Sequence, residues 1–137
     1  MHCRIVIVAV AVTGIVFPSM AIAQSTLRTE DLVGRWGVAA YWNDADAARI
    51  KTQARSFCNQ PYVIAKGSNG SARMFEAFQG KPTDVVVQSG QIIAVAGDNG
   101  KSTKAIQSWD GSTLVFNYVD DEAKRKYGNM VFARCGK

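Results

Sequence analysis

Turn-forming residues recur at short intervals along the chain, and this spacing restricts the folds available to it. The segments between the turns are short, and apolar side chains alternate with polar ones in several of them, as in strands with one buried face. About eight such segments at roughly ten-residue spacing predict a mainly β fold, either a sandwich or an antiparallel up-and-down barrel. The predicted strands are Val33–Trp42, Pro61–Lys66, Ala72–Phe78, Thr83–Ser89, Gln91–Ala96, Thr103–Trp109, Thr113–Val119 and Tyr127–Cys135.

One segment between the first two predicted strands has a helical period instead. Asn43-Asp44 supplies an N-cap, and Asn59-Gln60-Pro61 ends the segment. Apolar residues between these limits are spaced three, four and three apart, which predicts an amphipathic helix that buries one face. That face consists of Ala47, Ile50, Ala54 and Phe57.

An acidic block followed by a basic one occupies Asp120 to Lys126. Opposite charges placed so close together favour a solvated loop or a short helix whose side chains pair with one another. The alternative is that the basic half contacts an anionic surface.

The first 23 residues have the form of a cleavable export signal. Ile5–Phe17 is an apolar run that follows the basic residue Arg4, and Ala21-Ile22-Ala23 is a small-x-small cleavage site. The run is shorter than the roughly 20 residues of a membrane-spanning helix. We therefore predict a signal peptide over residues 1–23, one domain over residues 24–137, no membrane span and a periplasmic or secreted location.

The cysteine count agrees with export. Cys3 leaves with the predicted signal peptide, so Cys58 and Cys135 remain as an even pair. Because neither belongs to a Cys-x-x-Cys motif, the pair predicts one structural disulfide.

Charge and histidine content exclude several functions. The formal charge of the whole chain is +5, and its basic residues are scattered, so we expect no nucleic-acid partner. His2 is the only histidine of the chain, and it lies in the predicted signal peptide. Without histidine, the mature chain lacks the usual base of a nucleophile pair and the usual ligand of zinc. We therefore expect a protein that is not an enzyme and that has no metal and no cofactor.

Glu76 is the best single candidate for carboxylate chemistry, because it shares an apolar strand parity with Met74 and Phe78. The simpler interpretation is a strand residue that faces solvent or pairs with Arg73 or with a neighbouring strand. Other carboxylates lie where turns are expected, and Gly97-Asp98-Asn99-Gly100 is typical of a hairpin turn rather than a phosphate loop.

Gly34 and Trp36 on the first predicted strand, with Arg134 near the end of the last, resemble the pattern of lipocalins (calycins). The resemblance implies a closed eight-stranded barrel in which the Trp fills one end and the late Arg packs across it. The alternation of side chains is compatible with this packing, because Met130, Phe132 and Arg134 share one side of the last strand. A disulfide from Cys58 to Cys135 would then tie the helix to the seam between the first and last strands.

A second resemblance is to periplasmic inhibitors of secreted metalloproteases. Those small barrels open with a polar arm followed by Leu-x-Gly-x-Trp, and here Ser25-Thr26-Leu27-Arg28 precedes Leu32-Val33-Gly34-Arg35-Trp36. The segment Trp109–Phe116, with its central Gly turn, is similar to paired strands of that family. This resemblance implies that an arm over Gln24–Asp31 enters a protease cleft.

These observations predict a monomeric, exported binding protein. The leading hypothesis is a small apolar or amphipathic ligand in the mouth of a calycin-like barrel, with Tyr41, Trp42 and Trp109 as rim residues because they lie near strand ends. The alternatives are a protein-binding module, such as an inhibitor of a secreted protease, and an envelope accessory protein without a ligand pocket.

Overall fold

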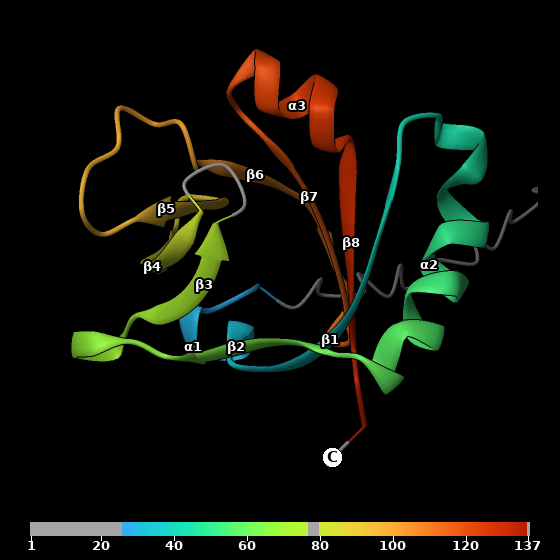
Figure 1. The fold of residues 1–137 in the computed structure, drawn as a ribbon, viewed down its shortest axis with the longest axis horizontal. Helices are drawn as coiled ribbons and strands as arrows, with labels where there is room; N and C mark the ends of the chain where they lie inside the picture. Colours follow the sequence, from blue (N-terminus) through green and yellow to red (C-terminus); the bar gives the residue numbers. More distant parts are fainter. Residues whose placement is uncertain (1–25, 77–79, 137) are drawn as a thin grey trace, which may run out of the picture.

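The structure, a computed structural model, describes residues 26–76 and 80–136 (Figure 1). Eight antiparallel strands form a closed barrel in which each strand pairs with its neighbours in the chain and β1 pairs with β8. The strands are β1 (Gly34–Tyr41), β2 (Tyr62–Lys66), β3 (Ala72–Glu76), β4 (Lys81–Gln88), β5 (Gln91–Ala94), β6 (Lys104–Trp109), β7 (Thr113–Tyr118) and β8 (Asn129–Arg134). The helices are α1 (Thr29–Leu32), α2 (Ala47–Ser56) and α3 (Asp121–Tyr127).

The pairing of β1 with β8 confirms the barrel and excludes the sandwich. Six residue pairs join the two strands, from Trp36 opposite Arg134 to Tyr41 opposite Asn129. Side chains of alternate positions point inward in a small barrel, and in β6 a register shift between Ile106 and Ser108 brings both Ile106 and Trp109 against the interior cluster. The interior cluster includes Trp36, Met74 and Phe132, and the aromatic rings of Trp36 and Phe132 lie 6.1 Å apart.

Helix α2 lies along the outside of the barrel beside β1 and β8 (Figure 1). Ile50 and Ala54 are buried against a second cluster that includes Val131. The approach is so close that a Cβ on Gly37 of β1 would lie 1.9 Å from the Ala54 carbonyl oxygen, so glycine is required there. Phe57 does not join this face as the spacing predicted. It is 41% exposed, because the helix gives way after Ser56 to a 3₁₀ turn at Phe57–Asn59.

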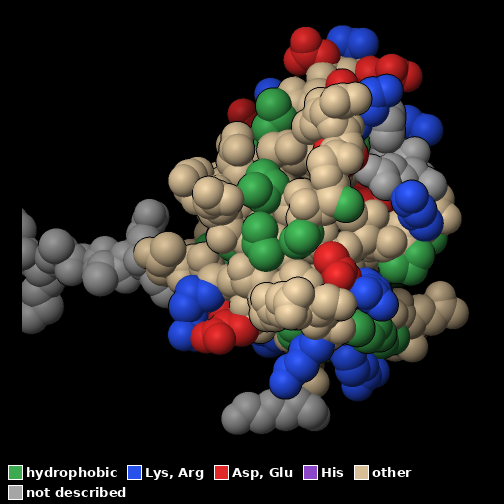
Figure 2. Space-filling view, turned by 90° about the vertical axis from the view of Figure 1, so that its left-hand side faces the viewer, with side chains coloured by type: hydrophobic (Ala, Val, Ile, Leu, Met, Phe, Trp, Pro, Cys, Tyr) green, Lys and Arg blue, Asp and Glu red, His purple; other side chains and the backbone are tan. Residues whose placement is uncertain are grey.

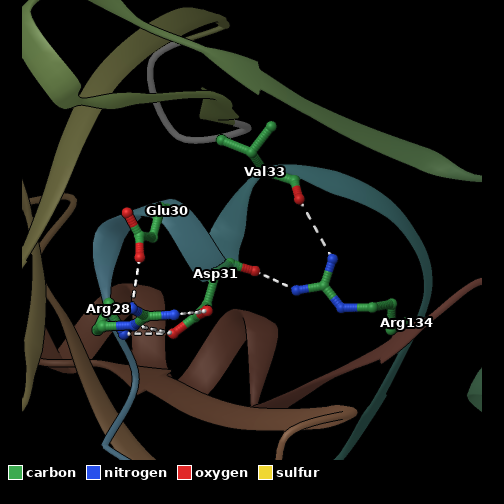
Figure 3. A network of polar contacts seen from close by, with 5 residues as sticks. All are labelled: Arg28, Glu30, Asp31, Val33 and Arg134. Atoms are coloured by element: carbon green, nitrogen blue, oxygen red, sulfur yellow. Dashed lines mark hydrogen bonds and ion pairs between the residues drawn. The ribbon is translucent and has the colours of Figure 1, made fainter.

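Trp36 and Arg134 close the end of the barrel that carries α1. The Arg134 guanidinium lies 4.2 Å from the centre of the Trp36 ring and donates to the main-chain oxygens of Val33, at 3.2 Å, and Asp31 (Figure 3). Trp36 Nε1 donates to the Leu32 oxygen at 2.8 Å. The packing implied by the lipocalin resemblance is therefore present.

Gly34 of the Gly-x-Trp motif is required by Arg134. Its φ of 145° lies in the region that favours glycine, and an added Cβ would lie 2.7 Å from Arg134 Nη1. The glycine and the arginine of the resemblance thus form one packing unit.

Helix α3 covers the opposite end of the barrel. The Asp120 side chain accepts a hydrogen bond from the Ala123 N–H at 2.9 Å and so caps the helix. The charged block forms the short helix that was one of the two conformations predicted for it, and Ala123 is buried beneath this helix. Since Tyr127 ends this helix, β8 begins at Asn129, later than predicted.

The connection between β5 and β6 is longer than predicted, since Gly97-Asp98-Asn99-Gly100 was expected to turn the chain between a strand that ends at Ala96 and one that begins at Thr103. Strand β5 ends at Ala94 and β6 begins at Lys104, so residues 95–103 form an extended loop at the α3 end. Within the loop, the Asp98 carboxylate accepts hydrogen bonds from the N–H, at 3.0 Å, and the hydroxyl of Ser102.

The predicted disulfide joins Cys58 and Cys135, 77 residues apart in sequence. It ties the turn after α2 to the residue that follows β8, and a loop of this length stabilises a fold by about 4 kcal/mol in the chain-entropy model. No helix among the described residues is long and apolar enough to cross a bilayer. The predicted signal peptide and Phe78 lie outside the described residues.

Candidate functional site

A cavity of about 160 Å³ lies toward the end of the barrel that α3 covers, lined mainly by interior side chains and also by Phe75, which is 52% exposed on the outer surface. Six of the ten residues that line it are aromatic, two are methionines, and one, Lys104, carries a charge. The lining consists of Val38, Tyr62, Met74, Phe75, Lys104, Phe116, Tyr118, Tyr127, Met130 and Phe132. Strands β1, β2, β3, β7 and β8 supply apolar or aromatic side chains to the lining, β6 supplies Lys104, and α3 adds Tyr127.

Lys104 and Glu76 form an ion pair inside the barrel. Lys104 is the first residue of β6 and Glu76 is the last residue of β3. The start of β6 and the end of β3 both lie at the α3 side of the barrel. Their relative exposures are 1% and 0%, and Lys104 Nζ lies 2.5 Å from Glu76 Oε1. Two charged side chains at this depth require each other, because an unpaired buried charge is strongly unfavourable.

Further polar groups complete the surroundings of the pair. Lys104 Nζ donates to the Ser102 main-chain oxygen at 2.9 Å, and the Tyr118 hydroxyl lies 3.5 Å from Glu76 Oε2. The ammonium also lies 5.1 Å from the centre of the Tyr118 ring, a cation–π distance. The Tyr62 hydroxyl donates to the Phe75 oxygen at 2.9 Å. The site therefore combines an aromatic wall with one satisfied pair of opposite charges.

Burial shifts the ionisation of these groups. It raises the pKa of Glu76 and lowers the pKa of Lys104, and the opposite charge of each partner works against the shift of the other. Burial, together with the charge of Glu76, raises the pKa of Tyr62 to about 12 and also raises the pKa of Tyr118. Both tyrosines are therefore neutral hydrogen-bonding groups at physiological pH.

Glu76 does not behave as the simpler interpretation predicted. It neither faces solvent nor pairs with Arg73, which instead bonds the Asp84 carboxylate from Nε at 2.8 Å. Its partner Lys104 comes from across the barrel and was not among the predicted site residues. Lys104 shares strand parity with Ile106, which packs on the interior cluster, and this parity was the available signal.

Of the predicted rim residues, Tyr41 and Trp42 lie at the α3 end but outside the cavity. Tyr41 packs against the cluster beneath α2. Trp42 is 64% exposed, and its Nε1 donates to the Arg125 main-chain oxygen of α3 at 3.0 Å. Tyr41 therefore contributes to the packing beneath α2, and Trp42 bonds α3.

Trp109 lies at the opposite end, with its ring centre 6.2 Å from that of Trp36. The structure therefore does not bring the three predicted rim residues together. Trp109 borders a separate surface groove of about 550 Å³ with Thr26, Leu27 and the turn between β4 and β5.

The described part of the Gln24–Asp31 arm is docked on the barrel rather than extended from it. Leu27 is buried in the interior cluster, and Thr29 Oγ1 accepts a hydrogen bond from the Val87 N–H at 2.9 Å. Arg28 and Asp31 bond each other through side chain and main chain (Figure 3). The segment ends in the single helical turn α1, Thr29–Leu32.

The side of the barrel away from α2 carries β4 and β5 (Figure 1). Figure 2 shows this side, with hydrophobic side chains in separate groups over the middle and charged side chains mainly around the margin. Exposed apolar residues of the outer barrel surface include Val63, Phe75 and Val95. They are scattered over several strands, which is ordinary for a protein surface.

Comparison of the chain with protein-family models, with curated proteins and with solved structures found no match. What the geometry defines is a closed eight-stranded antiparallel barrel of lipocalin-like form, with a helix between its first two strands. Among the described residues, no group of three or more His, Cys, Asp or Glu side chains is placed to hold a metal ion.

Proposed function

We propose that this protein is an exported, non-catalytic binding protein that holds a small, largely apolar molecule in the cavity beneath α3. The observation that carries the proposal is the cavity itself: most of its lining is interior to a closed barrel, its wall is mostly aromatic, and the buried Lys104, paired with Glu76, is part of that wall. Apolar walls with a few fixed polar groups are typical of small-molecule sites.

The size of the cavity limits the ligand. A dry, apolar cavity of about 150 Å³ accommodates a molecule the size of benzene, and the cavity here has about 160 Å³. The proposed ligand is therefore a single ring or a short branched chain.

Binding without catalysis is proposed because the candidate site offers no nucleophile paired with a base. Its two strongly polar residues, Lys104 and Glu76, are bonded to each other. Export is proposed from the form of residues 1–23, and the Cys58–Cys135 bond supports it because structural disulfides are typical of oxidising compartments.

Native mass spectrometry of the protein purified from its own compartment tests this proposal. We expect a retained small molecule that disappears in Val38→Phe, because the larger ring occupies the cavity. The matched control is Val63→Phe, which makes the same change at a side chain on the outer surface that is 58% exposed. Retention of the same molecule by Val38→Phe would contradict the proposal, as would a wild-type protein that retains nothing and binds no aromatic probe.

A further inference from the structure

We infer that the ligand is neutral, has an apolar, mainly aromatic body and carries one hydrogen-bond acceptor, as an aryl ketone does, and that Lys104 donates to that acceptor. This inference rests on the proposed function and specifies its ligand class.

The aromatic body of the ligand is inferred from the aromatic side chains that line the cavity. Phe132 stands in edge or tilted contact with two neighbours, Tyr62 at 5.3 Å and Phe116 at 5.1 Å between ring centres. Tyr118 adds a further ring, in edge contact with Phe116. Rings arranged in this way present faces and edges to a flat guest, and aromatic pairs of this geometry are favourable beyond the area that they bury.

The acceptor follows from the hydrogen bonds of Lys104. A lysine ammonium has three N–H donors. Two are directed to Glu76 Oε1 and to the Ser102 main-chain oxygen, and among the described residues Lys104 makes no third hydrogen bond. The hydroxyls of Tyr62 and Tyr118 are already directed to protein oxygens. Lys104 lines the cavity beside the Tyr118 ring, whose centre lies 5.1 Å from the ammonium, and its remaining N–H is the donor that we assign to a ligand there.

The neutrality of the ligand follows from the charges around the cavity. Glu76 and Lys104 together carry no net charge, and transfer of a proton within the pair does not change this. A cationic guest would meet the ammonium of Lys104, the one charged side chain in the lining. An anionic guest would have to share that ammonium with the Glu76 carboxylate, which lies 2.5 Å from Lys104 Nζ. Either guest would also lose its hydration in an apolar wall, which is unfavourable without a compensating partner.

Binding of four probes of similar size tests the inference, with dissociation constants from isothermal titration calorimetry. α-Methylstyrene and acetophenone have the same shape but differ in the acceptor, and benzoate and benzylammonium add a charge of either sign. We expect wild-type protein to bind acetophenone about tenfold or more tightly than α-methylstyrene, since a hydrogen bond to a charged donor has that effect. We expect the two charged probes to bind most weakly.

The variant Glu76→Met/Lys104→Met removes both charges and keeps side chains of similar length. We expect it to bind α-methylstyrene as the wild type does and to lose the preference for acetophenone. The matched control, Arg73→Gln/Asp84→Asn, removes an ion pair on the outer surface and should keep the preference. A second measurement does not depend on a variant: the NMR signal of the wild-type Lys104 Nζ should shift with acetophenone and not with α-methylstyrene.

The outcomes separate this inference from the proposed function. If no probe binds, both fail. If α-methylstyrene binds as tightly as acetophenone, or if a charged probe binds most tightly, the inference fails while the proposed function stands. If the double variant still prefers acetophenone, or if the NMR signal of Lys104 Nζ does not shift with acetophenone, Lys104 is not the donor to the ligand.

Discussion

Lys104 and Glu76 meet across the interior of the barrel, with the ammonium nitrogen 2.5 Å from a carboxylate oxygen and neither residue more than 1% exposed. The two residues lie on strands that are not neighbours, since β4 and β5 separate β3 from β6. The pair therefore links opposite sides of the barrel at the end that holds the cavity.

Removal of one member of this pair should destabilise the fold more than removal of both. Lys104→Met or Glu76→Met leaves a buried charge without its partner, which typically costs about 3–5 kcal/mol of unfolding free energy. Replacement of both by methionine restores an apolar interior, and we expect a loss smaller than that of either single variant. Equilibrium urea unfolding of the four proteins measures this. Additive losses would show that the two side chains do not depend on each other.

Arg134 should hold α1 against the barrel. Its guanidinium donates to the main-chain oxygens of Asp31 and Val33 and stacks on Trp36, so Arg134→Met removes two charge-assisted hydrogen bonds. We expect a loss of about 2–3 kcal/mol and faster amide hydrogen exchange in α1 than in β3.

Arg35→Met is the matched control for Arg134→Met, because Arg35 lies on the adjoining strand with its side chain exposed. It should leave both the stability and the exchange of α1 near wild type. Equal effects of the two variants would contradict the role of Arg134.

Gly37→Ala should disrupt the packing of α2 on β1. The added methyl group would lie 1.9 Å from the Ala54 oxygen and 3.4 Å from Cys58 Sγ, and a main-chain atom of a helix has little freedom to move away. We expect a loss of about 3 kcal/mol, the upper part of the range for overpacked sites. Gly97→Ala is the control, since a methyl group there meets nothing within 4 Å. Thermal unfolding that ranks the two variants equally would contradict this account.

The barrel was predictable because its signals are local. The period of two in each strand and the turn residues between strands define the elements without knowledge of their partners. The motif residues Gly34, Trp36 and Arg134 then indicate which strands close the barrel. The same local signals failed at Phe57, because the helical period continues through a residue at which the backbone has already tightened into a 3₁₀ turn.

The candidate site was less predictable, because it depends on which side chains meet across the barrel. Glu76 was identified from its apolar parity, but a partner 28 residues away on a strand that is not a neighbour has no local signal. Lys104 at the parity of Ile106 was the only indication, and only the closed barrel shows that the two charges meet. Tyr41 and Trp109 were grouped because both lie near strand ends, but the barrel places them at opposite ends, so they do not form one site.

The Arg73–Asp84 pair on the outer surface should make the stability of the fold depend on pH in the acid range, through the lowered pKa of Asp84. The Arg73 side chain, bonded to Asp84 from Nε at 2.8 Å, holds the pKa of that carboxyl below its usual value, and the Ser68 N–H adds to the effect. Because the pKa is lower in the folded state than in the unfolded one, this stabilisation is complete above the unfolded pKa, about 3.9, and is lost as pH falls through the folded pKa. Arg73→Gln should therefore raise the pKa of Asp84, measured by NMR titration of its carboxyl carbon, while Arg35→Gln should not. An unchanged Asp84 titration in Arg73→Gln would show that Arg73 does not set the pKa of this carboxyl.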